Sequence, residues 1–350
     1  MSCESPYLSI VAVSRNDDHG GRLLERMQQF IDCLNEQVNH FQIPVELILV
    51  EWNPPSDRPS LEAVITWPSS SQYFTIRIVT VPSEIHKKFQ NSDKLPLFQM
   101  IGKNVGIRRA NGQFILATNV DILFSNELMK YLSERQLKSG CFYRTNRIDV
   151  DANIPVGVPL EEKLAYCRSH VIRINSRYFL SNIENLRALM IDIVKNPVLL
   201  GYYFKNLIYK LKIPRLHYNA CGDFTLLAKN DWEALRGYPE LEMYSLHIDS
   251  LFLMAASGST LCEQVLHGPQ EIYHIEHRIG SGITPGQGQR ILFKRLEKDQ
   301  IPYLTWRDCV NLFQKLKEQV TNENMMIHCN EGSWGLPDTP LVEKPVSICT

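Results

Sequence analysis

Residues 102–124 read GKNVGIRRANGQFILATNVDILF, and this stretch indicates the fold of the whole chain. It opens as the end of a helix, which the Asn-Gly pair at 111–112 stops and turns. The apolar run at 114–117 is typical of a buried parallel strand. Asn119 and Asp121 follow on alternate positions, so both side chains can point to one side just past that strand. Open α/β sheets bind their ligands at this carboxyl end of their strands.

The side chains of Asn119 and Asp121 offer oxygen atoms, which hard cations such as Mg²⁺ and Mn²⁺ prefer as ligands. Such a cation typically bridges a protein carboxylate to a substrate phosphate. An isolated Asn-x-Asp also suits a plain polar turn after a strand. The rest of the sequence therefore has to decide between a ligand site and a turn.

The composition excludes several classes of protein. A length of 350 residues, with 44% apolar and 21% charged residues, is ordinary for a globular chain of one large or two small α/β domains. A formal net charge of −1 gives no electrostatic reason to expect a nucleic-acid partner. The longest apolar runs, such as 45–50, are too short to form a transmembrane segment.

The N-terminus shows no signal peptide, because no positive region followed by a long apolar run is visible there. The nine cysteines are scattered without a Cys-x-x-Cys pair, which argues against a structural zinc site and a disulfide scaffold. We therefore expect a cytoplasmic protein in a reducing environment.

The pattern of apolar residues predicts alternating strands and helices. Strands are expected at 7–13, 45–50 and 74–81, with an amphipathic helix at 23–39 between the first two, which makes a right-handed βαβ unit. Residues 152–216 break this pattern. The other expected elements are helices at 95–109, 125–137, 229–235, 250–256 and 305–320, and strands at 141–144 and within 220–228.

Four landmarks stand along the chain in a fixed order. The first is an apolar strand ending in Ser14-Arg15-Asn16-Asp17, and the second is Glu51 at the end of the second strand. The third is Lys103-Asn104-x-Gly106, upstream of Asn119-Val120-Asp121. The fourth is Gly222-Asp223-Phe224, followed by Arg236-Gly237-Tyr238-Pro239-Glu240 and Asp249. In this order and spacing they resemble the GT-A fold glycosyltransferases, specifically the family 2-like enzymes, which use a nucleotide-diphosphate sugar. The resemblance covers roughly residues 7–149 and 217–279.

The resemblance implies an α/β fold with a GT-A-type, Rossmann-like mixed sheet, mainly parallel, flanked by helices and carrying a helical insertion. Residues 1–149 would bind the nucleotide sugar, and 217–300 would form the acceptor and catalytic half of the same domain. Residues 301–350 would form a C-terminal helix and an extended tail. The resemblance does not cover the insertion, 150–216, and its break in the α/β pattern favours a lid that closes over the site. Its alternative is an interfacial helix in peripheral contact with a membrane, with Tyr202, Tyr203, Phe204 and Tyr209 inward and Lys205, Lys210 and Lys212 towards the headgroups.

The resemblance also implies roles for single residues in binding the donor. Ser14, Arg15, Asn16 and Asp17 would line the nucleotide pocket. Glu51 would accept hydrogen bonds from the base or ribose, while Lys103 and Asn104 would face phosphate or sugar, with Asp223 counted among the same donor-binding residues.

Asp121 would hold a divalent cation, Mn²⁺ or Mg²⁺, in the metal motif of that family. The usual motif has two carboxylates, whereas Asn119 is neutral and would touch ribose or metal-bound water. His274 or His277 would serve as a late imidazole ligand, and we expect one of them at the metal rather than both. We choose His274.

Asp249 looks like the general base of the family, which removes the acceptor hydroxyl proton during attack on the anomeric carbon. The alternative is that Asp249 caps a helix and complements its dipole. Arg144, Arg147 and Asp149 would either touch acceptor or sugar hydroxyls or form a solvated ion-pair cluster.

The sequence therefore favours a glycosyltransferase, inverting and metal-assisted, that moves a sugar from a UDP-sugar to a hydroxyl of a glycan, a lipid or a small molecule. A nucleotidyltransferase is one alternative, although His19-Gly20-Gly21 only weakly matches the glycine-rich loop, bearing Arg or Lys, of that class. A sugar-nucleotide-binding protein without turnover is another, because Asn119 replaces a carboxylate. A dehydrogenase is disfavoured, since no Gly-x-Gly-x-x-Gly follows the first strand.

Overall fold

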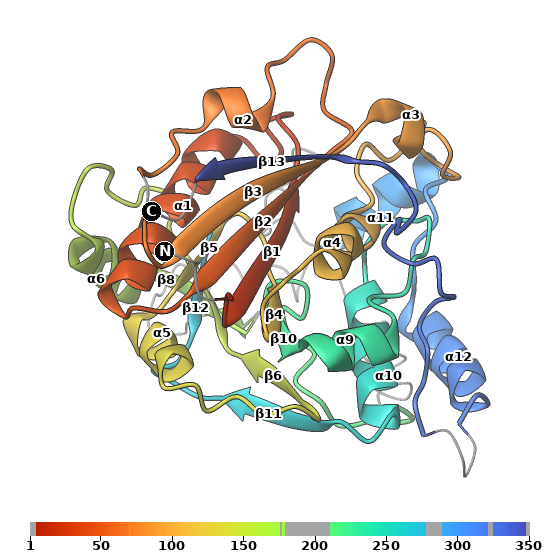
Figure 1. Cartoon of the computed structure of the whole chain (residues 1–350). Coiled ribbons are helices and arrows are strands. Elements are labelled where there is room, and N and C mark those ends of the chain that lie inside the picture. Colours follow the sequence, from red (N-terminus) through yellow and green to blue (C-terminus); the bar gives the residue numbers. More distant parts are fainter. Residues whose placement is uncertain are drawn as a thin grey trace.

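An eight-stranded mixed sheet lies at the centre of this computed structural model, which describes residues 5–69, 71–175, 177–178, 211–277, 289–320 and 325–347. The order of its strands is β11 (Cys262–Leu266), β6 (Cys141–Thr145), β10 (Thr225–Ala228), β4 (Phe114–Ala117), β1 (Leu8–Ser14), β2 (Val45–Trp52), β3 (Phe74–Val81) and β13 (Val342–Ser347) (Figure 1). β1 pairs in parallel with β2 and β4, β2 with β3, and β6 with β11. β10 and β13 run antiparallel to their neighbours. The predicted α/β fold with a mixed, mainly parallel sheet is confirmed.

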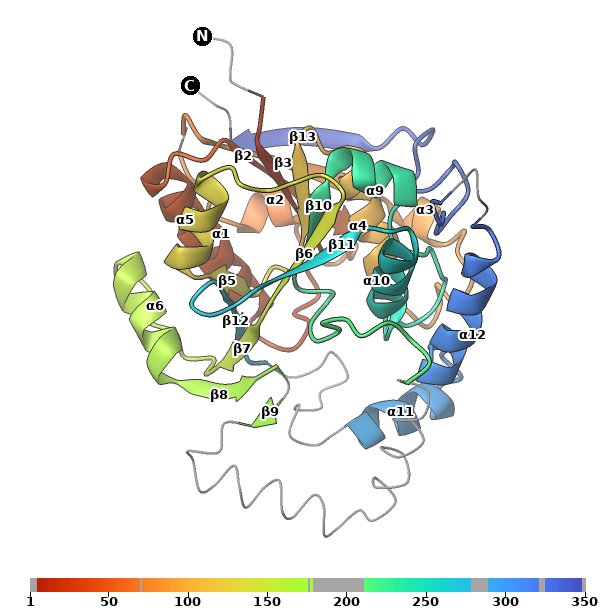
Figure 2. The same cartoon turned by 90° about the horizontal axis from the view of Figure 1, so that it is seen from below.

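A second, five-stranded sheet lies below the large one. The order of its strands is β5 (Ile122–Phe124), β12 (Ile272–Ile275), β7 (Arg147–Val150), β8 (Val171–Ile174) and β9 (Arg177–Tyr178). β7 follows β6 after one residue, and β12 follows β11 after a short turn, so the parallel pair β6–β11 leads into the parallel pair β7–β12. Figure 2 shows this smaller sheet next to the lower end of the large sheet.

Helices cover both faces of the large sheet, which explains why its central strands are continuous apolar runs. On β1, the side chains of Leu8 and Ile10 enter one core, while Val11 and Val13 enter the other. Among the described residues, no helix is long and apolar enough to cross a membrane. The helices are α1 (Leu23–His40), α2 (Leu61–Val64), α3 (Ser83–His86), α4 (Gln99–Arg108), α5 (Asn126–Ser133), α6 (Leu160–Ser169), α9 (Lys229–Leu235), α10 (Ile248–Gly258), α11 (Gln289–Lys298) and α12 (Trp306–Lys317).

Most predicted elements are present with shifted ends. The helix expected over 95–109 begins only at Gln99, because Pro96 disfavours helical geometry in the residue before it. Ser125 caps α5 as predicted, since its hydroxyl accepts the N–H of Leu128 at 3.1 Å. The helix α11 was not predicted. Of the residues expected to form a lid or an interfacial helix, the aromatics and lysines at 202–210 lie outside the described residues, whereas Lys212 is described and lies in a turn.

The extended tail after the last helix contains a strand that was not predicted. β13 pairs with the edge of β3 and closes that side of the large sheet. Glu343 on β13 forms ion pairs with Arg77 and Arg109, the latter at 3.0 Å. Trp334, upstream of β13, is buried under the guanidinium of Arg108 at 4.7 Å from the ring centre. The tail therefore packs directly against the end of α4.

The helix α4 lies unusually close to the sheet because two glycines face β1 and β2. A Cβ on Gly106 would lie 2.5 Å from Cγ1 of Val11 and 3.2 Å from Cγ2 of Val50. A Cβ on Gly102 would lie 2.6 Å from Cγ2 of Val13. The same helix carries Lys103, which is buried.

We expect Gly106→Ala to lower the free energy of unfolding by about 1–3 kcal/mol, because the added methyl overpacks a rigid core. Urea denaturation would measure this change. Gly332→Ala is the matched control, since a Cβ there meets no atom within 4 Å. Equal stability of the two variants would contradict the packing described here.

Candidate functional site

The carboxyl ends of β1 and β2 meet at one edge of the large sheet. Ser14 pairs in register with Glu51, and both residues are buried. Glu51 accepts the N–H of Leu61 at 2.7 Å, and Asn16 donates to a carbonyl of the same β2–β3 connection at 2.9 Å. The predicted nucleotide-binding residues of the two strand ends are therefore neighbours in space, and the loop after β1 is fixed against the loop after β2.

Two further predicted residues lie in the loop after β1. Arg15 donates through Nε to the carbonyl of Asn53 at 3.1 Å, and its Nη1 lies 3.4 Å from Oδ2 of Asp17. Burial raises the pKa of the Glu51 carboxyl above its ordinary value, against the hydrogen bond from Leu61, which lowers it. A ligand hydroxyl or N–H bonded to this carboxylate would favour its charged form.

Asp121 lies between β4 and β5, where the sequence predicted a metal ligand, and it is 8% exposed. Its Oδ2 lies 3.0 Å from Nε2 of His277 and 4.0 Å from Nε2 of His274. Its Oδ1 is buried, with no hydrogen-bond partner among the described residues. A buried carboxylate oxygen without a partner costs free energy. A bound cation would supply the missing interaction.

The charge of Asp121 also suits a metal ligand. Burial alone would raise the pKa of Asp121, but the hydrogen bond from His277 and the charges of His274, His277 and Arg26 together hold it well below its ordinary value. Metal ligands must be deprotonated to bind. The Asp121 carboxylate meets this condition at neutral pH.

His274 is oriented by a second carboxylate. Its Nδ1 lies 2.9 Å from Oδ1 of Asp149, which is fully buried. When Nδ1–H donates to this carboxylate, the lone pair of Nε2 remains on the side of Asp121. Burial would raise the pKa of Asp149, but His274, Arg147 and Arg173 lower it to about 2, so the carboxylate is ionised. A carboxylate behind an imidazole is the usual means of orienting a metal-binding histidine.

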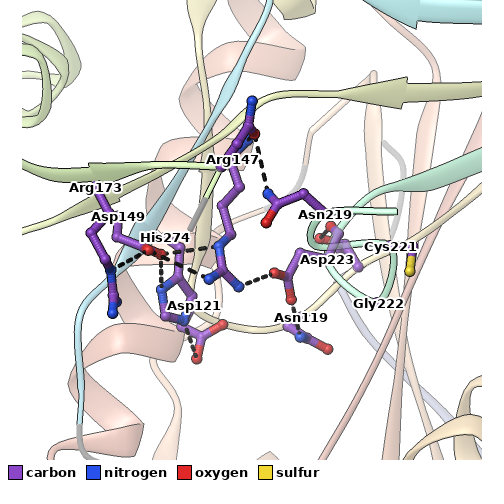
Figure 3. Close-up of polar contacts among 12 residues, drawn as sticks. Asn119, Asp121, Arg147, Asp149, Arg173, Asn219, Cys221, Gly222, Asp223 and His274 are labelled. Carbon is purple, nitrogen blue, oxygen red and sulfur yellow. Dashed lines mark hydrogen bonds and ion pairs between the residues drawn. The ribbon is translucent and has the colours of Figure 1, made fainter. Parts of the chain in front are cut away.

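Arg147 connects the histidine side of the site to Asp223, which follows the insertion in the sequence (Figure 3). Its Nε lies 3.0 Å from Asp149, and its Nη1 donates to Asp223 at 2.6 Å. Both arginines of this network, Arg147 and Arg173, lie on strands rather than beyond strand ends. Of the two roles predicted for Arg144, Arg147 and Asp149, the structure shows an ion-pair cluster of Arg147 and Asp149, in a buried rather than a solvated form. Arg144 is also buried, but it donates to Thr225 and to the carbonyl of Asn219 instead.

Asn119 lies apart from the two histidines. Its amide donates to Oδ1 of Asp223 at 2.5 Å, and its carbonyl oxygen accepts from Gln99 at 2.9 Å (Figure 3). The side chains of Asn119 and Asp121 therefore make separate contacts, although they stand two positions apart. Asp121 rather than Asn119 carries the cluster of metal-type ligands.

Lys103 is completely buried beneath this edge. Its ammonium donates to the carbonyl of Gly222. Burial lowers the pKa of Lys103 to about 8, although the charges of Asp223, Asp249 and Asp121 oppose this shift. Three predicted site carboxylates, from both halves of the predicted site, therefore lie within electrostatic range of one buried lysine.

Asn104 is also fully buried, and its amide binds the protein itself. It donates to the carbonyl of Tyr238 at 2.8 Å and to Glu240 at 3.0 Å, and it accepts the N–H of Tyr238 at 2.8 Å. In this structure Asn104 holds the 238–240 segment against α4. A contact with donor phosphate or sugar, as the resemblance implied, remains a prediction for this residue.

Asp249 is the second residue of α10, and His247 is the N-cap. Asp249 therefore does not stand at the N-cap, but its carboxylate lies in the first turn, where it complements the helix dipole as the alternative predicted. Oδ1 of Asp249 accepts the N–H of Ser250 at 2.8 Å. Its Oδ2 lies 3.1 Å from the point that a Cβ on Gly222 would occupy, so the carboxylate packs against the residue before Asp223.

The group Asp121, His274 and His277 can hold a divalent cation, since one atom of each lies within 4.8 Å of the others. A carboxylate oxygen and two imidazole nitrogens are ligands that Mn²⁺ and similar ions accept. A second group, Asp149, His274 and Glu276, is less suitable, because Arg173 forms ion pairs with both of its carboxylates.

From the sequence we expect only one histidine at the metal, but in the structure both His274 and His277 lie close to Asp121. β12 runs antiparallel to β5, and the Ile275 N–H donates to the Asp121 carbonyl at 3.0 Å. His274 and His277 stand before and after Ile275 in the sequence, so this backbone hydrogen bond holds both close to Asp121. The contribution of Asp149 was also not predicted. An Asp on a strand carries no sequence signal of its own, and only the strand pairing His274↔Asp149 shows the contact.

Neither a protein-family model nor a curated protein sequence matches this chain. Among solved structures, the chain is similar to the catalytic domain of Drosophila beta1,4-galactosyltransferase 7, solved in complex with xylobiose. That match has 12% identity and a TM-score of 0.34, and covers 77% of this chain and 71% of the other. A second match, to residues 1–349 of S. aureus TarS, has 13% identity and a TM-score of 0.40, and covers 77% and 60% of the two chains. Both likenesses are distant, so the argument for function rests on the site itself.

Proposed function

We propose that this chain is an inverting glycosyltransferase that moves a sugar from a nucleotide-diphosphate sugar, a UDP-sugar, to an acceptor hydroxyl. One observation carries the proposal. The ionised, partly unpaired Asp121 carboxylate lies beside two imidazoles, past the carboxyl end of a strand in the parallel part of the sheet, where α/β sheets bind nucleotides. The end of β1, with Ser14 and the loop to Asp17, and the end of β2, with Glu51, form the neighbouring part of that edge and would hold the nucleoside.

The chain's own residues divide the work. Asp121, His274 and His277 would hold Mn²⁺ or Mg²⁺, and this ion would neutralise charge on the diphosphate leaving group as a Lewis acid. Asp149 orients His274. Asp249, beside Gly222 and Asp223, would accept the proton of the acceptor hydroxyl as it attacks the anomeric carbon.

Lys103 would stabilise the carboxylates around the acceptor. Its buried ammonium lies within the electrostatic range of Asp223, Asp249 and Asp121. Arg147 forms ion pairs with both Asp149, which lies behind the metal ligand His274, and Asp223, which lies near Asp249. It would therefore hold these two parts of the site at a constant distance. These contacts make the two sides of the site one connected unit.

A second candidate is a sugar-nucleotide-binding protein without turnover. The contact that favours it is the amide of Asn119, which is engaged by Asp223 and Gln99 and supplies no second carboxylate to a metal. Turnover distinguishes the two functions. A nucleotide-release assay across a panel of nucleotide sugars, with and without Mn²⁺, should detect metal-dependent release from at least one donor. Binding of a donor with no release from any donor would instead support the second candidate.

Glu51→Ala should weaken nucleotide binding by about 1–3 kcal/mol, the cost of removing one partner of a buried hydrogen bond. The substitution also removes the acceptor for the Leu61 N–H, so the unfolding free energy is measured alongside the affinity. Glu62→Ala is the control, because Glu62 is exposed and pairs with Lys344. If a folded Glu51→Ala protein binds nucleotide as tightly as the control, Glu51 has no part in the pocket.

A further inference from the structure

Two cysteines face each other at the open edge of the large sheet, away from the proposed active site. β11 is the edge strand, and it pairs in parallel with β6. In this register Cys262 stands directly opposite Cys141. Residues paired in register point to the same face of a sheet. The two thiols therefore lie side by side.

The spacing of paired strands suits a disulfide. Neighbouring strands lie about 4.8 Å apart, and disulfides join residues whose Cα atoms are about 4.4–6.8 Å apart. Burial raises the pKa of the Cys141 thiol, and the neighbouring Cys262 adds to this shift through its charge and a hydrogen bond. The register itself brings the two side chains within reach of each other, because they leave neighbouring strands at paired positions on one face.

The pair is also accessible to small molecules. Cys262 is exposed and Cys141 is partly exposed, so an oxidant can reach Cys262 from solvent. Another pair, Cys33 and Cys167, offers a contrast, since both residues are buried. Burial raises the pKa of each of these thiols to about 12, so the reactive thiolate is scarce there.

We propose that Cys141 and Cys262 form a reversible disulfide that serves as a redox-sensitive clamp between β6 and β11. The oxidant is a small disulfide such as oxidised glutathione. The Cys262 thiolate attacks one sulfur of this molecule, and a mixed disulfide forms as the first glutathione thiolate leaves. Cys141 then attacks the Cys262 sulfur and releases the second glutathione, so two protein thiols are oxidised and one small disulfide is reduced to two thiols.

The clamp would act on the strands that lead into the proposed active site. β11 leads into β12, which carries His274, and β6 leads into β7, which carries Asp149. A covalent bond at Cys262 would prevent the edge strand from separating from β6. We therefore expect slower amide hydrogen exchange in β11 and a higher urea midpoint in the oxidised protein.

The test treats the full chain with glutathione mixtures of increasing oxidised fraction, followed by thiol titration and peptide mass spectrometry under non-reducing conditions. The expected result is the loss of two titratable thiols and a linked peptide pair containing Cys141 and Cys262, both reversed by a reductant. Cys262→Ser and Cys141→Ser should each abolish the linked pair. Cys329→Ser, a control at a partly buried cysteine elsewhere, should retain it.

Two results would overturn the proposal. One is an unchanged thiol count at every glutathione ratio. The other is a stable mixed disulfide between glutathione and Cys262 in the unsubstituted protein, because it would show that Cys141 does not resolve the intermediate. Neither result bears on nucleotide or metal binding, which is measured separately.

Discussion

Asp249→Asn is expected to retain nucleotide binding while reducing turnover by roughly 10²–10⁴-fold, the usual contribution of a positioned base. The amide keeps the size of the side chain and the oxygen that accepts the Ser250 N–H. It cannot take a proton from the acceptor hydroxyl at neutral pH. Because His247 is the N-cap of α10, the substitution should leave the helix terminus and the melting temperature nearly unchanged.

The measurement is nucleotide release in the steady state, with water as the acceptor until a better one is found. Asp308→Asn is a matched control, because Asp308 is also a carboxylate in the first turn of a helix but belongs to the capping box of α12. Near-normal turnover in a folded Asp249→Asn protein would remove the catalytic assignment. Asp223 or Glu240 would then be the next candidate, although both carboxylates accept hydrogen bonds within the protein.

Asp121→Asn should weaken Mn²⁺ binding by more than the 10–100-fold that loss of an outer-shell partner roughly costs, because Asp121 contacts the ion directly in this account. Asparagine preserves the volume of the buried side chain but removes the charge that balances His274, His277 and Arg26. Electron paramagnetic resonance titration of free Mn²⁺ measures the affinity without any donor or acceptor.

Asp151→Asn provides the control for Asp121→Asn, since Asp151 accepts hydrogen bonds from Asn153 and Tyr166 and lies outside the metal-type groups. Unfolding curves of both variants establish that each is folded. Equal Mn²⁺ affinities for the two proteins would exclude Asp121 as a ligand.

The sequence allowed the large sheet to be predicted because its strands are buried on both faces. The apolar runs at 7–13, 45–50, 74–81 and 114–117 all became strands of that sheet, with ends shifted by at most two residues. The strand β13 carries three exposed or charged residues, Val342, Glu343 and Lys344, and it is held by edge pairing to β3 rather than by its own apolar pattern. Such a strand has no periodic signal to read.

The site likewise contains residues that local sequence patterns predict and residues that only long-range contacts bring together. Asp121 could be predicted because it directly follows a buried strand, which is a local feature. The convergence of His274 and His277 on Asp121 depends on the pairing of β12 with β5, about 150 residues away in sequence. The hydrogen bonds of Asn104 with the 238–240 segment likewise join residues that are far apart in the sequence. No spacing within the sequence reveals either contact.

Calorimetric titration of the unmodified protein with UDP, first without a metal and then with Mn²⁺, tests whether the site binds a nucleotide together with a cation. The account predicts that UDP binds and that Mn²⁺ tightens this binding, because Asp121, His274 and His277 lie where an ion would bridge the protein to a diphosphate. Absence of binding by UDP and by every other nucleoside diphosphate tested, with or without Mn²⁺, would contradict it.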